Sequence, residues 1–123
     1  MNTIIDTKVL IVEDEETLRH AVTRLLERRG FSVLEACEGR TAIDILRSNG
    51  PHIGVVLLDI RLPDLDGGDV FANMCLINPA VKVILTTACH REIPAGERRP
   101  WGYLRKPYHI DALANLLNNA LAA

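Results

Sequence analysis

Short runs of apolar residues alternate along this chain with longer stretches in which apolar residues recur every three or four positions. Five runs are predicted strands: 8–12, 32–36, 55–58, 81–85 and 101–104. Four longer stretches have the spacing of amphipathic helices: 15–29, 40–48, 68–77 and 109–121. The central runs are apolar without a break, which is typical of strands buried on both faces. This alternation predicts an α/β fold in which helices cover both faces of a parallel sheet.

The stretch between the last two predicted strands departs from this pattern. Residues 89–100 read CHREIPAGERRP and contain two prolines, one glycine and five charged residues, with almost no apolar stripe. A helix is due at this place in the alternation. We expect the fourth helix of the fold to be short or irregular, or this segment to be mobile.

Length and charge narrow the class of protein. A chain of 123 residues predicts one domain over residues 1–123. The formal charge of −2, from 14 basic and 16 acidic residues, does not favour binding to nucleic acid or to a membrane surface. No apolar run is long enough to span a bilayer. The three cysteines lie far apart without a CxxC pair, so we expect reduced thiols and a cytoplasmic protein.

Polar side chains follow four of the predicted strands, at the ends where ligands bind in open parallel sheets. Acidic residues 13–16 follow the first strand and Asp59 follows the third. Thr86 and Thr87 follow the fourth, and Lys106 follows the fifth. Carboxylates held close together repel one another unless a cation joins them, and hard oxygen ligands suit Mg²⁺. A lysine and a threonine hydroxyl could bind phosphoryl oxygens, so the group is suited to phosphoryl transfer.

Asp59 has two interpretations. A single acid at the end of a strand is commonly a turn or capping residue. A carboxylate among other acids and a lysine can instead be a nucleophile that forms an acyl phosphate. The company of Asp14, Thr87 and Lys106 at matching strand ends favours the nucleophile.

Four motifs resemble the receiver domain of two-component response regulators. They are VLIVEDE at 9–15, VVLLDIRLPDLDG at 55–67, VILTTA at 83–88 and YLRKPY at 103–108. Each motif alone is only modestly specific for the family, but all four in this order at these spacings are highly specific. The resemblance covers about residues 7–122 and implies a flavodoxin-like, doubly wound sheet with strand order 2-1-3-4-5.

The resemblance also implies roles for the acidic residues. Asp59 would accept a phosphoryl group from a phosphohistidine of a sensor kinase. Glu13 and Asp14 match the acidic pair of the family. Asp14 and Asp59, with the main-chain carbonyl of Arg61, would hold Mg²⁺, and Glu13 would act mainly through water.

The remaining site residues are implied by the last two motifs. Lys106 matches the phosphate-binding lysine and Thr87 the switch hydroxyl of the family. Tyr103 matches the switch aromatic, which turns inward when the threonine engages the phosphate. The interval from Thr87 to Lys106 is shorter than usual and lacks the Ala-Leu-rich helix of the family, in a region that often forms the output and dimer surface.

The expected function is therefore a phosphorylation-operated signalling switch. Such a protein catalyses its own phosphorylation and slow dephosphorylation and is not a metabolic enzyme. The implied partners are a sensor histidine kinase or phosphotransfer protein and a downstream effector or fused output domain, with no direct contact to nucleic acid or membrane. Whether the protein forms a homodimer is left open. The alternative is a receiver-shaped binding module that works without phosphorylation. A dehalogenase-type hydrolase is disfavoured because Arg61 stands where that class has a second acid.

Overall fold

The strands form a single five-stranded parallel sheet in the order β2-β1-β3-β4-β5. The computed structural model describes residues 7–88 and 99–123. The strands are β1 (Lys8–Val12), β2 (Ser32–Ala36), β3 (Ile53–Asp59), β4 (Lys82–Thr87) and β5 (Gly102–Arg105). The predicted parallel sheet and its strand order are confirmed.

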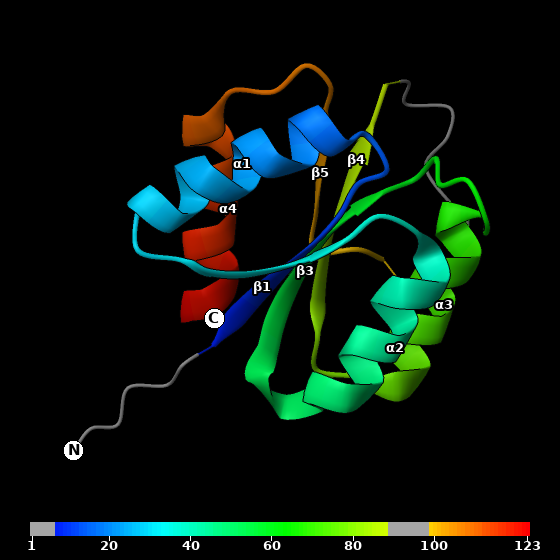
Figure 1. The fold of residues 1–123 in the computed structure, drawn as a ribbon. Helices are drawn as coiled ribbons and strands as arrows, with labels where there is room; N and C mark the ends of the chain where they lie inside the picture. Colours follow the sequence, from blue (N-terminus) through cyan, green and yellow to red (C-terminus); the bar gives the residue numbers. More distant parts are fainter. Residues whose placement is uncertain (1–6, 89–98) are drawn as a thin grey trace.

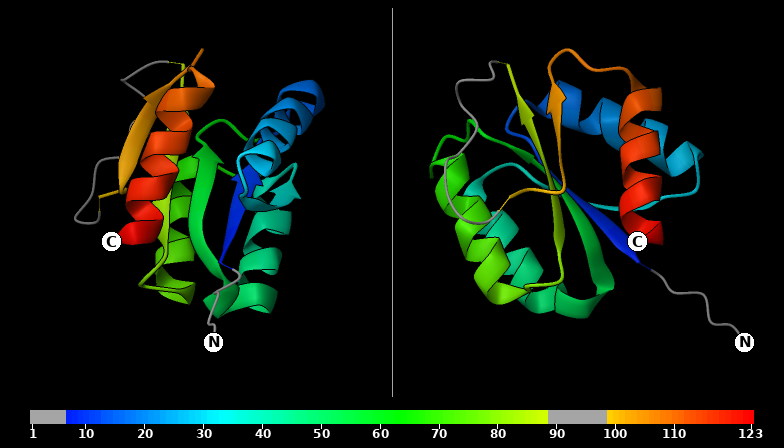
Figure 2. Two further views of the ribbon diagram at one scale, coloured as in Figure 1. Left: turned by 90° about the vertical axis from the view of Figure 1, so that its left-hand side faces the viewer. Right: turned by 180° about the vertical axis from the view of Figure 1, so that it is seen from behind.

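Helices lie on both faces of this sheet (Figure 1). They are α1 (Glu16–Arg28), α2 (Gly39–Asn49), α3 (Gly67–Ile77) and α4 (Ile110–Ala122), with a short 3-10 turn η1 (Gly50–His52) before β3. The view from behind separates the pair α1 and α4 from the pair α2 and α3, with the sheet between them (Figure 2, right). The short or irregular helix expected within 89–100 falls mainly on residues 89–98, which lie outside the described residues.

Two apolar clusters, one on each face, explain why the central runs are continuous. On β1, Leu10 and Val12 join the cluster beneath α2 and α3, while Val9 and Ile11 join the cluster beneath α1 and α4. All four are at most 1% exposed. Side chains of a strand point alternately to its two faces, so a strand with a core on each side needs an apolar residue at every position.

The ends of the strands differ from the sequence prediction in a way that matters for the site. Asp59, Thr86 and Thr87 are not beyond their strands but are their last paired residues, with Asp59 opposite Thr86 and Thr87 opposite Arg105. The apolar run predicts where a strand is buried, whereas backbone pairing continues for as long as a neighbour is available. The backbone positions from which these polar side chains project are thereby fixed by the sheet ladder itself.

The face that α1 buries is narrower than its apolar stripe. Val22, Thr23 and Leu26 are buried, while Ala21 and Leu25 are exposed. Leu25 is 39% exposed. The two cysteines within the described residues, Cys37 and Cys75, are free thiols. None of the described helices is long and apolar enough to cross a membrane.

Candidate functional site

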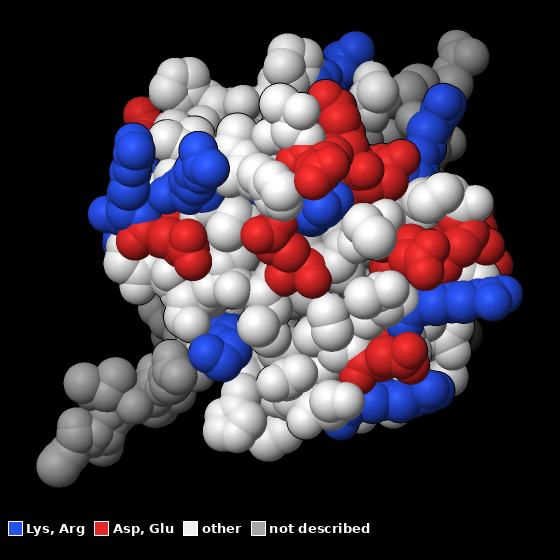
Figure 3. Space-filling model, viewed as in Figure 1, with Lys and Arg blue, Asp and Glu red and all other residues white. Residues whose placement is uncertain are grey.

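The candidate site lies at the edge of the sheet where the strands end. Glu13 directly follows β1, Asp59 ends β3 and Lys106 directly follows β5. These residues, with Asp14 and Arg61, help to line a cleft of about 440 Å³. Figure 3 shows acidic side chains gathered along the same edge of the molecule. Asp14 is exposed, whereas Glu13 and Asp59 are 5% and 6% exposed.

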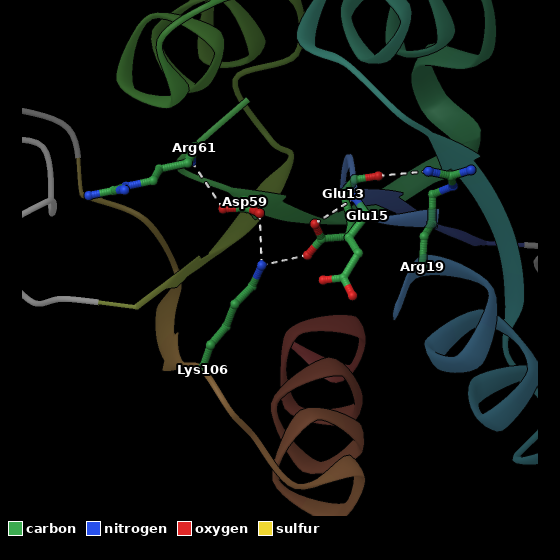
Figure 4. Close-up of polar contacts among 6 residues, drawn as sticks. All are labelled: Glu13, Glu15, Arg19, Asp59, Arg61 and Lys106. Carbon is green, nitrogen blue, oxygen red and sulfur yellow. Dashed lines mark hydrogen bonds and ion pairs between the residues drawn. The ribbon is translucent and has the colours of Figure 1, made fainter. Parts of the chain in front are cut away.

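Lys106 joins the two buried carboxylates (Figure 4). Its Nζ donates to Oε1 of Glu13 over 2.6 Å and to Oδ2 of Asp59 over 2.8 Å. Burial alone would lower the pKa of Lys106, but the bonds to the two carboxylates outweigh it and raise the pKa. For Glu13, burial outweighs the lysine and raises the pKa. The lysine is therefore held as a cation, and it offsets the repulsion between two acids that water reaches poorly.

Glu13 is also fixed by its own loop. Its Oε2 accepts the backbone N–H of Glu15, at the start of α1, over 3.1 Å. Arg19 on α1 donates from Nη1 to the carbonyl of Glu13 and from Nε to Glu35 on β2, both over 2.9 Å. Arg19 was not predicted from the sequence, because its partners lie on separate elements and leave no local pattern. It braces the loop that carries the acidic pair.

Asp59 is fixed on its other oxygen by the loop that follows it. Oδ1 accepts the backbone N–H of Arg61 over 3.0 Å, as drawn in Figure 4. Arg61 in turn pairs with Asp66 in an isolated antiparallel bridge. Asp66 caps α3, since its side chain accepts from the N–H groups of Gly68 and Asp69. These contacts hold the turn after β3 in place, from the carboxylate of Asp59 to the start of α3.

The carboxylates fit a divalent cation. Glu13, Asp14 and Asp59 each offer one oxygen, and these oxygens lie within 4.8 Å of one another. They are the one such group of three among residues 7–88 and 99–123. An all-oxygen, carboxylate-rich set suits Mg²⁺, which takes one or two protein carboxylates and keeps several waters. The structure brings together the acids that were predicted as metal ligands, while the part of the Arg61 carbonyl stays a prediction.

The two predicted switch residues differ in their distance from the cleft. Thr87 ends β4, is 1% exposed, and its carbonyl accepts the backbone N–H of Lys106 over 2.9 Å. Tyr103 stands on the edge strand β5 opposite Leu85 and is 36% exposed. Thr87 thus belongs to the same sheet edge as the acids. Tyr103 does not line the cleft in this conformation.

Similarity to known proteins agrees with this geometry. Over 118 residues the chain is 31% identical to the sensor kinase CckA of Brucella abortus, covering 92% of the chain but 12% of that protein. It is 28% identical to the sporulation initiation phosphotransferase F of Bacillus subtilis, covering 96% of both. It is 41% identical to the positive alginate biosynthesis regulatory protein of Pseudomonas aeruginosa, covering 91% of the chain and 46% of that protein.

Solved structures and a family model give the same result. A response regulator receiver domain protein from Clostridium thermocellum superposes with a TM-score of 0.84 at 30% identity, over 94% of both chains. The receiver domain of the hybrid histidine kinase CckA superposes with a TM-score of 0.79 at 28% identity, over 93% of this chain and 98% of the other. The model of the response regulator receiver domain matches residues 9–118. With its five-stranded parallel sheet and acidic strand ends, the chain belongs to the receiver domain family of two-component response regulators.

Proposed function

We propose that this protein is a phosphorylation-operated switch in which Asp59 accepts a phosphoryl group from a phosphohistidine. The observation that carries the proposal is the position of Lys106, whose Nζ lies 2.8 Å from Asp59 and 2.6 Å from Glu13 inside the cleft. A carboxylate buried beside a cation and further acids is what formation of an acyl phosphate needs.

The reaction is an in-line displacement at phosphorus. An oxygen of Asp59 forms a bond to phosphorus as the bond from phosphorus to the histidine nitrogen breaks, and that nitrogen keeps the electron pair. Lys106 is released from Asp59 and pairs with a phosphoryl oxygen. Asp14, Asp59 and the Arg61 carbonyl would hold Mg²⁺ directly, with Glu13 acting through water. The ion supplies charge neutralisation when it is bound.

The switch follows from Thr87 and Tyr103. The Thr87 hydroxyl would donate to a phosphoryl oxygen at the end of β4, and Tyr103 would then turn inward from the edge strand. The exposure of Tyr103 supports this proposal, since a 36% exposed ring on an edge strand has room to change its position.

A groove beside the acidic cleft supports a protein as the phosphodonor. It is about 510 Å³ in volume and is lined by apolar residues of α1, including Leu18 and Leu25, and by residues 106–110. Lys106 lines both this groove and the acidic cleft. A partner that covers the exposed apolar residues of α1 would therefore hold its phosphohistidine next to Asp59.

The wider setting is part of the same proposal. We place the protein in the cytoplasm as a single receiver domain over residues 1–123, with a sensor histidine kinase or phosphotransfer protein upstream. An effector protein or a fused output domain would act downstream. The names of the similar proteins, among them a sensor kinase, a phosphotransferase and regulatory proteins, support this setting. The alternative of a binding module without phosphorylation is disfavoured because Glu13, Asp14, Asp59 and Lys106 are all present.

The proposal is tested by phosphorylation with a small phosphodonor. Acetyl phosphate with Mg²⁺ should add one phosphoryl group to the wild-type protein, and Asp59→Asn should abolish the addition, as measured by intact-protein mass spectrometry. Asp44→Asn is the matched control because Asp44 is an exposed carboxylate on α2. Labelling of Asp59→Asn at the wild-type rate would overturn the assignment. A wild-type protein that takes up no phosphoryl group from any donor would favour the binding module.

A further inference from the structure

One acidic residue outside the predicted site makes two contacts to another element. Asp64 lies in the loop between β3 and α3, yet its side chain accepts from the first turn of α2. Oδ1 accepts the N–H of Gly39 over 2.8 Å and Oδ2 accepts the N–H of Arg40 over 2.9 Å. Each carboxylate oxygen of Asp64 is therefore engaged by one of the N–H groups that a helix start leaves without an internal partner.

The start of α2 depends on this loop. Glu38 occupies the N-cap position of α2, but its side chain makes no capping hydrogen bond. The backbone at Gly39 also packs closely against the loop and against α3. A Cβ at Gly39 would lie 2.8 Å from Cγ2 of Val70 and 3.2 Å from Cβ of Leu65. Asp64 thus does for α2 what a helix's own N-cap residue normally does.

The same loop caps a second helix. Asp66 accepts from Gly68 and Asp69 at the start of α3, over 2.7 and 3.3 Å. Between Asp59 and these two caps lies Arg61, which bonds to Asp59 through its N–H and pairs with Asp66. The loop that leaves the candidate phosphoacceptor is therefore attached to α3 at its end and to α2 at Asp64.

We propose that Asp64 is a positioning residue for the divalent cation: by tying the loop to α2, it fixes the backbone of Arg61 relative to Asp59. This inference rests on the proposed function, since it concerns the same cation. Loss of a group that orients metal ligands without touching the metal typically lowers metal affinity by about 10- to 100-fold.

The charge state of Asp64 suits this role. Partial burial raises the pKa of its carboxyl group, but the hydrogen bonds from the amides of Arg40 and Gly39 outweigh burial and lower the pKa below its usual value. The carboxylate is ionised at neutral pH, and its negative charge interacts favourably with the positive end of the α2 dipole.

The test is Mg²⁺ binding to the full chain, measured by isothermal titration calorimetry at neutral pH. Asp64→Ala should weaken Mg²⁺ binding about tenfold, the lower end of the range for groups that orient metal ligands. Asp64→Asn keeps one acceptor oxygen and should lie between Asp64→Ala and the wild type. Amide hydrogen exchange should be faster at Gly39 and Arg40 in both variants. Asp44→Ala is the matched control, because it removes one negative charge from the exposed side of α2 without touching the loop, and it should leave the Mg²⁺ affinity unchanged.

The outcomes separate three explanations. Unchanged affinity in Asp64→Ala, with faster exchange at Gly39, would make Asp64 a cap of α2 and nothing more, and would overturn the inference. Equal losses in Asp64→Ala and Asp64→Asn would assign the effect to charge and would also overturn it. A wild-type protein that binds no Mg²⁺ would overturn the proposed function and this inference together. If Asp59→Asn weakens Mg²⁺ binding but Asp64→Ala does not, the inference alone is overturned.

Discussion

Lys106 determines the charge state of the site, because it is the cation between two acids that are almost out of contact with water. Its own side chain is 24% exposed, while those of Glu13 and Asp59 are 6% and 8% exposed. Removing one partner from such a group leaves the others uncompensated, which costs more than the intact pair contributes. The lysine therefore stabilises the resting protein as well as serving the proposed phosphoryl group.

Replacing Lys106 by methionine should destabilise the protein in a pH-dependent way. Burial already raises the pKa of Glu13 above its ordinary value, so the folded protein binds this proton at a higher pH than the unfolded chain does. The stability gained from that protonation grows as the pH falls and is lost as the pH rises through the folded-state pKa. Without the lysine this pKa rises further. We expect Lys106→Met to cost on the order of 2 kcal/mol at about pH 8 and clearly less at about pH 5.

Urea unfolding of the wild type and the variant at both pH values measures this difference. The double variant Glu13→Gln with Lys106→Met is the control, because it removes one of the two carboxylate charges that the lysine compensates. It should recover most of the stability at the higher pH. An equal loss at both pH values would mean that lost packing of the lysine stem, and not charge, explains the effect.

At the scale of elements, the turn from β3 to α3 requires glycine at position 67. The N–H of Gly67 donates to the carbonyl of Ile60 over 3.1 Å. A Cβ on Gly67 would lie 2.3 Å from that same oxygen and 2.5 Å from Cα of Ile60. Both are backbone atoms, so a side-chain rotation cannot relieve the clash. The close approach of the helix start to the residue after Asp59 depends on the absence of a Cβ.

Gly67→Ala should therefore lower the free energy of unfolding by about 2–3 kcal/mol, the upper part of the range for overpacking. Gly102→Ala on β5 is the matched control, because its added Cβ would meet Cδ2 of Leu116 at 3.6 Å, an ordinary contact. The control should change stability by less than about 1 kcal/mol. Thermal and urea unfolding of both variants measure the difference, and equal stability of the two would show that the turn can rearrange.

Elements of this protein differ in how far the sequence alone predicts them. Continuous apolar runs predict the buried strands, because a strand with a core on each face leaves no other pattern open. The meeting of Glu13, Asp59 and Lys106 follows from the rule that parallel strands end at one edge. The cap that Asp64 gives α2 could not be predicted, since its partners lie 24 and 25 residues away. The burial of Thr23 in place of Ala21 and Leu25 likewise depends on how α1 lies on the sheet.

At the scale of the whole molecule, the site adds side-chain contacts between strand ends that the sheet has already brought to one edge. Lys106 follows the edge strand β5, Asp59 ends the inner strand β3, and Glu13 and Asp14 follow β1. Sequence neighbours cannot make this connection, since Lys106 lies 93 residues from Glu13 and 47 from Asp59. The carboxylates converge into a cation site only in the folded state, so a cation bound there binds the folded protein and not the unfolded chain. Its binding free energy should therefore appear as global stability.

Mg²⁺ should raise the melting temperature of the wild-type protein, and the stabilisation should grow with the logarithm of the ratio between its concentration and the dissociation constant. At ten times that constant the expected stabilisation is about 1.4 kcal/mol, which corresponds to a shift of several degrees for a chain of this size. Asp59→Asn should reduce the shift, whatever its own starting melting temperature, because one of the three converging oxygens loses its charge. NaCl at matched ionic strength separates site binding from general screening. A shift that NaCl reproduces, or that Asp59→Asn and Asp14→Asn leave intact, would show that Mg²⁺ acts elsewhere on the molecule.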